Sequence, residues 1–253
     1  MAQLFVENVS KVFDGLSSPV TALQNASLRV GDGEFVSILG PSGCGKSTLL
    51  FLIAGLDMPS SGRIASNGEV VTGTARSRHV VFQDSALFPW RTALENVTIG
   101  LEGRMSKKSA ASIAREHIAL MGLTGFEDAF PRQLSGGMRQ RVAIARALAM
   151  EPTVLLMDEP FAAVDTLTRE RLQEELLRIW EIKRTTILFV THGIDEAIFL
   201  SQRIVVMTPR PGTIREIVEV NAGYPRTYLF RSDPIAARLR TQLYQRFQND
   251  SGE

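Results

Sequence analysis

The stretch GPSGCGKSTLL, residues 40–50, decides the fold class of this chain of 253 residues. It fits the pattern G-x-x-x-x-G-K-[ST] and lies between two apolar runs, FVSIL before it and STLLFLIAG after it. The first run predicts a strand, and the second predicts a helix that ends at Gly55. Because strand, loop and helix follow in the order that this motif requires, we predict a phosphate-binding loop rather than an ordinary glycine-rich turn.

The residue types of this loop suit a nucleotide and Mg²⁺. Glycines let backbone N–H groups turn toward one anion, and the N-terminus of the following helix adds partial positive charge. The Lys46 ammonium suits the β- and γ-phosphates, the Ser47 hydroxyl suits Mg²⁺, and Cys44 is predicted to fill space. The predicted nucleotide-binding residues here are Gly40, Pro41, Ser42, Gly43, Cys44, Gly45, Lys46, Ser47 and Thr48.

Two adjacent carboxylates follow a second apolar run, in TVLLMDEP. Ligands bind at the carboxyl ends of parallel strands, so Asp158 and Glu159 are expected beside the phosphate loop. Asp158 is predicted to hold Mg²⁺ through water. Glu159, one residue further, is predicted to polarise the water that attacks the γ-phosphate. Together with the loop, the pair predicts a nucleotide hydrolase.

The order of predicted elements indicates one α/β domain over residues 1–253. Short β-branched runs with turns, including the Asn67–Gly68 hairpin signal, predict an antiparallel β subdomain around the phosphate loop. Ser106 is predicted to cap a helix over 107–121, within a helical subdomain over about 88–150. Strands and helices then alternate, which predicts a parallel sheet. Asp233 is predicted to cap a final helix over about 233–248 that packs on the core through Ile235, Leu239 and Leu243.

The stretch QLSGGMRQRVAIARAL, which begins at Gln133, resembles the signature of the ATP-binding-cassette (ABC) family. Ser135, Gly136 and Gly137 begin a predicted helix, so they form a second anion site at a helix N-terminus. The resemblance implies ATP as the nucleotide and a head-to-tail pair of chains. In such a pair the signature of one chain covers the γ-phosphate held by the loop of the other. Met138 departs from the usual Gln of this motif.

Further motifs of that family follow in order, and the resemblance covers nearly the whole chain. It implies that Phe13 stacks on adenine, although a Phe taken alone more often belongs to the core. It implies that Gln83 reaches the metal and the attacking water, and that Asp165 belongs to the loop FAAVD. His192 matches the histidine that contacts the γ-phosphate, and Gly193 departs from the commoner Asp. The predicted catalytic residues are Glu159, His192 and Gln83, and the predicted metal ligands are Ser47, Gln83 and Asp158.

The composition of the chain limits which partners and which cellular compartment we expect. The net charge of +1 gives no electrostatic argument for a nucleic-acid partner. One cysteine excludes an internal disulfide and suits a reducing compartment. The N-terminus lacks the pattern of a secretory signal, and no apolar run approaches the ~20 residues of a membrane helix. We therefore expect a cytoplasmic protein that does not itself cross a membrane.

Two stretches indicate how the energy of hydrolysis is used. In ALFPW, residues 86–90, the side chains of Leu87, Phe88 and Trp90 would form an apolar surface for a permease subunit. With residues 196–214, this stretch resembles the nitrate/sulfonate/taurine importer branch of the family. The resemblance implies an ATPase subunit at the cytoplasmic face of the inner membrane. Two copies would lie beneath two permease subunits that are served by a substrate-binding protein.

Other interpretations stay open at this point. A stand-alone ABC ATPase that remodels a soluble machine would carry the same motifs. A kinase with the same phosphate loop would transfer phosphate to a metabolite, but it would leave the signature helix and His192 unexplained. The transported anion is barely encoded, because the substrate does not touch this chain. Taurine or a related sulfonate is our expectation, with nitrate as the alternative.

Overall fold

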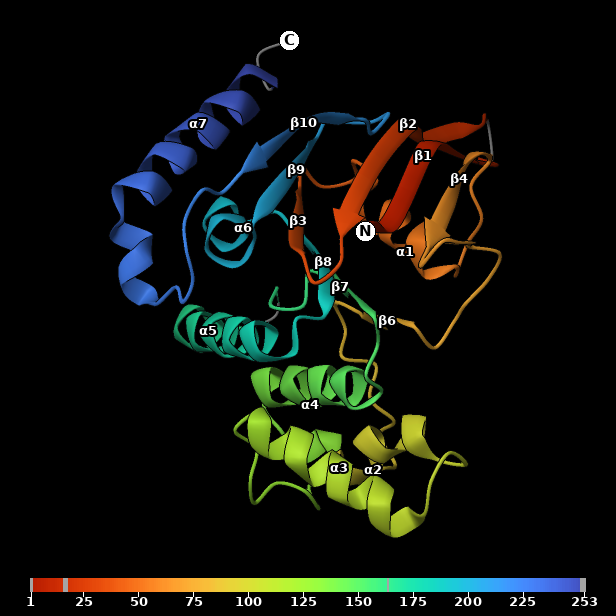
Figure 1. Cartoon of the computed structure of the whole chain (residues 1–253), viewed down its shortest axis with the longest axis vertical. Helices are drawn as coiled ribbons and strands as arrows, with labels where there is room; N and C mark the ends of the chain where they lie inside the picture. The colour runs from red at the N-terminus through yellow and green to blue at the C-terminus, as the bar shows by residue number, and fades with distance from the viewer. Residues whose placement is uncertain (1, 16–17, 163, 251–253) are drawn as a thin grey trace.

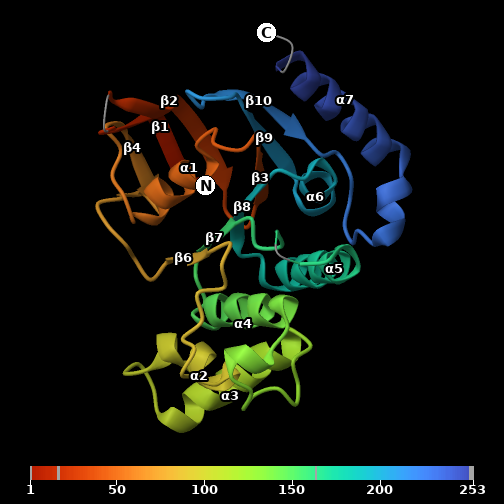
Figure 2. The same cartoon turned by 180° about the vertical axis from the view of Figure 1, so that it is seen from behind.

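The computed structural model describes residues 2–15, 18–162 and 164–250. Figures 1 and 2 show a smaller sheet beside a larger one, with a layer of three helices at the far end of the molecule from helix α7. The helices are α1 (Lys46–Ala54), α2 (Ala93–Thr98), α3 (Lys107–Leu120), α4 (Gly136–Ala149), α5 (Thr166–Lys183), α6 (Ile194–Leu200) and α7 (Pro234–Asp250), with short 3-10 turns η1 (Ile99–Leu101), η2 (Pro131–Gln133) and η3 (Tyr228–Ser232).

The smaller sheet is antiparallel, as predicted. Its strand order is β2-β1-β4-β5, with β1 (Ala2–Phe13), β2 (Val20–Gly31), β4 (Ser61–Ser66) and β5 (Glu69–Val70). Strands β4 and β5 are joined at Asn67 and Gly68, whose φ angles of 53° and 82° are both left-handed. A two-residue hairpin needs this conformation and Asn-Gly adopts it readily, so the predicted hairpin is confirmed.

The larger sheet is mostly parallel and positions the predicted site. Its order is β10-β9-β3-β8-β7-β6, and only the pair β10·β9 is antiparallel. Every residue of β3, β7 and β8 is buried, as in sheets covered on both faces. Because these three strands are parallel neighbours, the segments that follow them meet at one edge. The bounds are β3 (Phe35–Leu39), β6 (Arg78–Val81), β7 (Val154–Asp158), β8 (Thr186–Thr191), β9 (Arg203–Met207) and β10 (Ile214–Glu219).

Helix ends follow the expected capping chemistry. The Ser106 hydroxyl accepts a hydrogen bond from the Ser109 N–H at 3.1 Å, which confirms the predicted cap of α3. That helix ends one residue earlier than predicted, since Met121 is its C-cap. Helix α1 ends at Gly55, whose φ of 75° is left-handed, as predicted.

Three apolar clusters hold the layers together. One joins α2–α4 and α5 to the sheet, where Phe35 meets Trp180 edge-on with ring centroids 5.8 Å apart. A second fills the space around α1 between the two sheets. The third lies under α7 and includes Leu239 and Leu243, so the predicted apolar face of this helix is confirmed. None of the helices within residues 2–15, 18–162 and 164–250 is long and apolar enough to cross a membrane.

Candidate nucleotide-binding and catalytic site

The loop between β3 and α1 has a conformation that requires glycine. Gly43 and Gly45 have φ angles of 76° and 96°. A Cβ on Gly45 would lie 2.8 Å from the Ala22 carbonyl oxygen, too close for any side chain. Cys44 is buried beneath the loop, and burial raises the pKa of its thiol. These facts agree with the predicted space-filling role of Cys44.

The Lys46 ammonium lies against the backbone carbonyls of this loop. Only 5% of the residue is exposed, and Nζ donates to the carbonyl oxygens of Gly40 at 2.8 Å and Pro41 at 2.9 Å. It also lies 4.0 Å from Glu159 Oε1. An ammonium has three donors and no acceptor, so phosphate oxygens can take the place of these oxygens. The loop therefore fits a bound polyphosphate.

Ser47 and Asp158 meet across α1 and β7. The Ser47 hydroxyl donates to Asp158 Oδ1 at 2.8 Å. Burial raises the pKa of Asp158, and the hydrogen bond from Ser47 partly opposes this shift. Two hard oxygen donors converge beside the phosphate loop, which is the donor type that Mg²⁺ prefers. The residues present therefore fit a Mg²⁺ ion.

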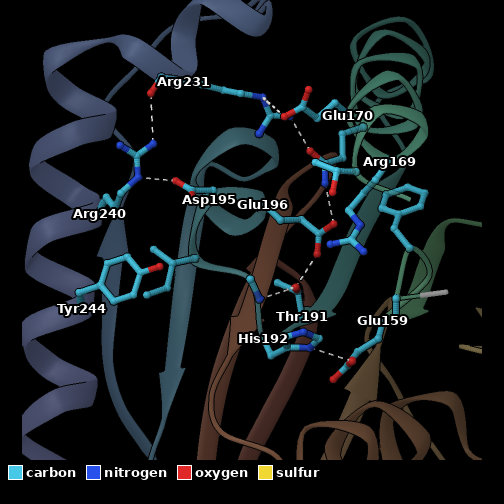
Figure 3. A pocket seen from close by; sticks show the side chains of 16 residues that line it. Glu159, Arg169, Glu170, Thr191, His192, Asp195, Glu196, Arg231, Arg240 and Tyr244 are labelled. Carbon is cyan, nitrogen blue, oxygen red and sulfur yellow. Dashed lines mark hydrogen bonds and ion pairs between the residues drawn. The ribbon is translucent and has the colours of Figure 1, made fainter. Parts of the chain in front are cut away.

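Glu159 and His192 form a second contact at the same edge. His192 Nδ1 lies 2.9 Å from Glu159 Oε2. Glu159 has a left-handed φ of 44°, and its N–H donates to the Val190 carbonyl at 3.0 Å. A non-glycine residue in this region is uncommon and persists where neighbouring contacts fix it. The Glu159 carboxylate points toward His192, as Figure 3 shows.

The predicted signature residues lie at the start of α4, in the helical layer. The Ser135 hydroxyl accepts from the Met138 N–H at 3.2 Å, and Ser135 is exposed. Asp165 caps α5 in the same way, accepting from the Thr168 N–H at 3.0 Å. That hydrogen bond lowers the pKa of Asp165. A Cβ on Gly137 would lie 3.1 Å from the Thr168 side chain, so the two helix starts are packed together.

Two further predicted site residues, Gln83 and Phe13, are exposed. Gln83 is exposed, and among the described residues it forms no hydrogen bond with Ser47 or Asp158. Phe13 is 41% exposed at the end of β1, which makes the core alternative for it wrong. The Lys11 ammonium lies 4.9 Å from the centre of its ring and is held by Asp57 at 2.6 Å.

Sequence reasoning missed residues that hold the segment after β6. Asn96 is fully buried, and its amide bonds to backbone groups of Phe88 and of the turn at 91–92. From α4, Arg146 donates to the carbonyls of residues 85 and 86, and Gln140 donates to that of Phe82. The signature helix therefore holds the segment that contains Gln83. An isolated Asn or Arg in a helix gives no sequence pattern that reveals such contacts.

The chain belongs to the ABC transporter family, whose model matches residues 23–162. It is thus an ATPase of the ATP-binding-cassette class, with ATP and Mg²⁺ as its cofactors. This confirms the resemblance stated from the sequence.

Named relatives match almost the whole chain. An uncharacterized ABC transporter ATP-binding protein of Methanocaldococcus jannaschii is 53% identical, over 88% of this chain and 84% of its own length. A bicarbonate transport ATP-binding protein of Synechocystis is 48% identical, over 98% and 92%. An aliphatic sulfonates import ATP-binding protein of Bacillus thuringiensis is 46% identical, over 96% and 95%.

A solved structure also matches closely. It is a dimeric ATP-binding cassette in a post-hydrolysis state, bound to ADP and phosphate. The TM-score is 0.77 at 34% identity, over 87% of this chain and all of the other. The match supports the predicted cassette fold.

The raised pKa of Asp158 predicts how replacing this residue with the neutral Asn changes the thermal stability of the chain. The native chain holds this proton more tightly than the unfolded chain, so stability falls as pH rises through the titration of Asp158. In EDTA at neutral pH, Asp158→Asn should therefore raise Tm, and the gain should disappear in acid. The exposed Asp165 has a lowered pKa, so Asp165→Asn is a control that should not raise Tm. A Tm for Asp158→Asn that stays at or below wild type at every pH contradicts the prediction.

Proposed function

We propose that this chain is the ATP-hydrolysing subunit of an importer for a small oxyanion and works beneath a separate membrane permease. One observation carries the hydrolytic part: the Ser47–Asp158 and Glu159–His192 pairs meet beside the phosphate loop at one sheet edge. The transport part is supported by relatives named for bicarbonate transport and aliphatic sulfonate import. Both of these cargoes are small oxyanions, and a sulfonate such as taurine remains our expectation.

The site residues are proposed to divide the chemistry of hydrolysis. Lys46 and the loop N–H groups bind the β- and γ-phosphates, and Phe13 stacks on adenine. Ser47, Asp158 and Gln83 hold Mg²⁺, which neutralises phosphate charge when bound. Glu159 takes the proton of the attacking water, and His192 holds both Glu159 and the γ-phosphate in place.

A second copy of the chain is proposed to complete each site. Ser135, Gly136 and Gly137 of one copy would cover the γ-phosphate bound by the other, and Asp165 would lie at the interface. The exposed Ser135 supports this arrangement, because the start of α4 is open to a ligand from outside the chain. The dimeric cassette with ADP and phosphate supports pairing of this kind.

The surface proposed for the permease follows β6. Trp90 is 70% exposed, and its ring centroid lies 5.5 Å from that of Phe88, while Leu87 packs on the core of the helical layer. Asn96 and Arg146 form hydrogen bonds with the backbone of the segment that carries these rings. Aromatic side chains of this kind often dominate binding energy at interfaces. This contact would hold the chain at the cytoplasmic face of the inner membrane.

Glu159→Gln should bind ATP but lose turnover, because the amide cannot take a proton from water. Two copies should then stay closed on ATP, and static light scattering in excess Mg-ATP should give a dimer. Glu116→Gln, on the exposed side of α3, is the control and should keep wild-type turnover. If the Glu159→Gln chain binds ATP yet remains monomeric, the proposed closure is wrong.

Affinity purification from gently solubilised host membranes tests the transport role. A tag at the C-terminus should recover a polytopic membrane protein in comparable amount. Trp90→Ser should abolish this recovery, whereas Tyr228→Ser, which changes a residue 66% exposed on η3, should not. Recovery from the soluble fraction alone would instead favour the stand-alone ATPase.

A further inference from the structure

A cavity of about 430 Å³ lies behind the Glu159–His192 pair. Figure 3 shows that side chains of the C-terminal segment reach into its wall, among them Arg231 and Arg240. This segment lies beyond the residues that the family model matches. The cavity therefore brings a C-terminal part of the chain next to the catalytic edge.

The central group of this wall is the Glu196 carboxylate, on the first turn of α6. Its Oε1 accepts from Gln173 Nε2 of α5 at 2.7 Å, and its Oε2 accepts from the Thr191 hydroxyl. Burial raises the pKa of Glu196, and both hydrogen bonds oppose that shift. The carboxylate thus depends on these two donors, because a poorly solvated charge without partners is costly.

Arg231 fixes the direction of the first donor. Its Nη2 donates to Gln173 Oε1 at 2.6 Å, and its guanidinium lies 4.3 Å from the centre of the Phe199 ring. A guanidinium has no acceptor, so the Gln173 oxygen must face Arg231 and its NH₂ group must face Glu196. Without Arg231, only the Glu196 carboxylate holds the Gln173 amide in this orientation.

The other end of this chain of hydrogen bonds holds the backbone around His192. The Thr191 hydroxyl donates to Glu196 and accepts from the Gly193 N–H at 2.9 Å. The His192 side chain is 61% exposed, so packing does little to orient it. Its direction toward Glu159 therefore depends on the backbone at 191–193, which the Thr191 hydroxyl holds.

Helix α7 adds a second link to the same turn. Arg240 forms an ion pair with Asp195, next to Glu196, and donates to the Arg231 carbonyl at 3.1 Å. Because Arg240 and Asp195 are partly exposed, this pair alone contributes little. It does hold the backbone that carries Arg231, so the guanidinium keeps its place at Gln173.

We propose that Arg231 is a positioning residue for ATP hydrolysis, acting through Gln173, Glu196 and Thr191 on the orientation of His192. The inference rests on the proposed ATPase function of His192 and Glu159. It predicts a change in the hydrolytic step and little change in nucleotide binding, because the phosphate loop lies outside these hydrogen bonds. A purely structural role for Arg231 would lower the amount of folded protein and leave the kcat of that folded fraction unchanged.

The test is steady-state ATPase of the full chain with Arg231→Met and, separately, Gln173→Leu. Each variant should lower kcat about tenfold, the size expected for losing one hydrogen bond of a charged group. The KM for ATP should change less than about twofold, since these variants act on chemistry and leave binding intact. Arg231→Lys, which keeps a cationic donor, should recover part of the loss. Arg238→Met, on the exposed side of α7, is the matched control and should behave as wild type.

A double variant distinguishes an effect of Arg231 on kcat that passes through Gln173 from two independent effects of these residues. Adding Arg231→Met to Gln173→Leu should cause no further loss of kcat, because the path is already broken. Additive losses, wild-type kcat in either single variant, or a parallel rise in KM would overturn the inference. If Arg231→Met does not fold, the kcat of Gln173→Leu alone tests the inference. This variant removes the amide between Arg231 and Glu196 and leaves Arg231 packed on Phe199. A wild-type chain without ATPase activity would contradict the proposed function instead.

Discussion

The rest of the catalytic edge depends on one requirement, which is that the buried ammonium of Lys46 must have polar partners. A charge with 5% exposure needs partners, and it has the carbonyls of Gly40 and Pro41. The loop can present those oxygens because its glycines adopt left-handed angles. The strand order β3-β8-β7 then brings His192, Asp158 and Glu159 to the same place. The chain thus holds the Lys46 ammonium and the Glu159 carboxylate near one another at the place proposed for phosphate and Mg²⁺.

The sheet edge does not contain the signature. Figure 1 shows α4 in the helical layer, which joins the sheet beyond the edge strand β6. Gln140 and Arg146 of α4 donate hydrogen bonds to backbone carbonyls of the segment after β6, so the signature helix is in direct contact with the segment that leads to the proposed permease surface. If two copies close on ATP as proposed, closure displaces α4 and carries Trp90 with it. Binding energy at the phosphates would thereby reach the permease.

The sequence was sufficient where structure follows from local chemistry. The glycines of the loop, the Asn67–Gly68 turn and the Ser106 cap are each determined within a few residues. Asp158 and Glu159 could be assigned to the sheet edge because they follow an apolar run, and His192 could be assigned only through the family resemblance. Asn96, Arg146 and Arg231 could not be identified, since their partners lie far away or on the backbone and leave no periodic pattern.

Mixing two inactive variants tests the central claim, that each ATP site combines the loop of one chain with the signature of another. Lys46→Ala removes the loop cation, and Ser135→Arg blocks the signature, so each variant alone should lack ATPase activity. A mixed dimer contains one site with an intact loop and an intact signature. We therefore expect that mixing the two purified variants restores part of the wild-type activity. Mixed dimers that form, as shown by two different tags, and remain inactive would contradict the claim.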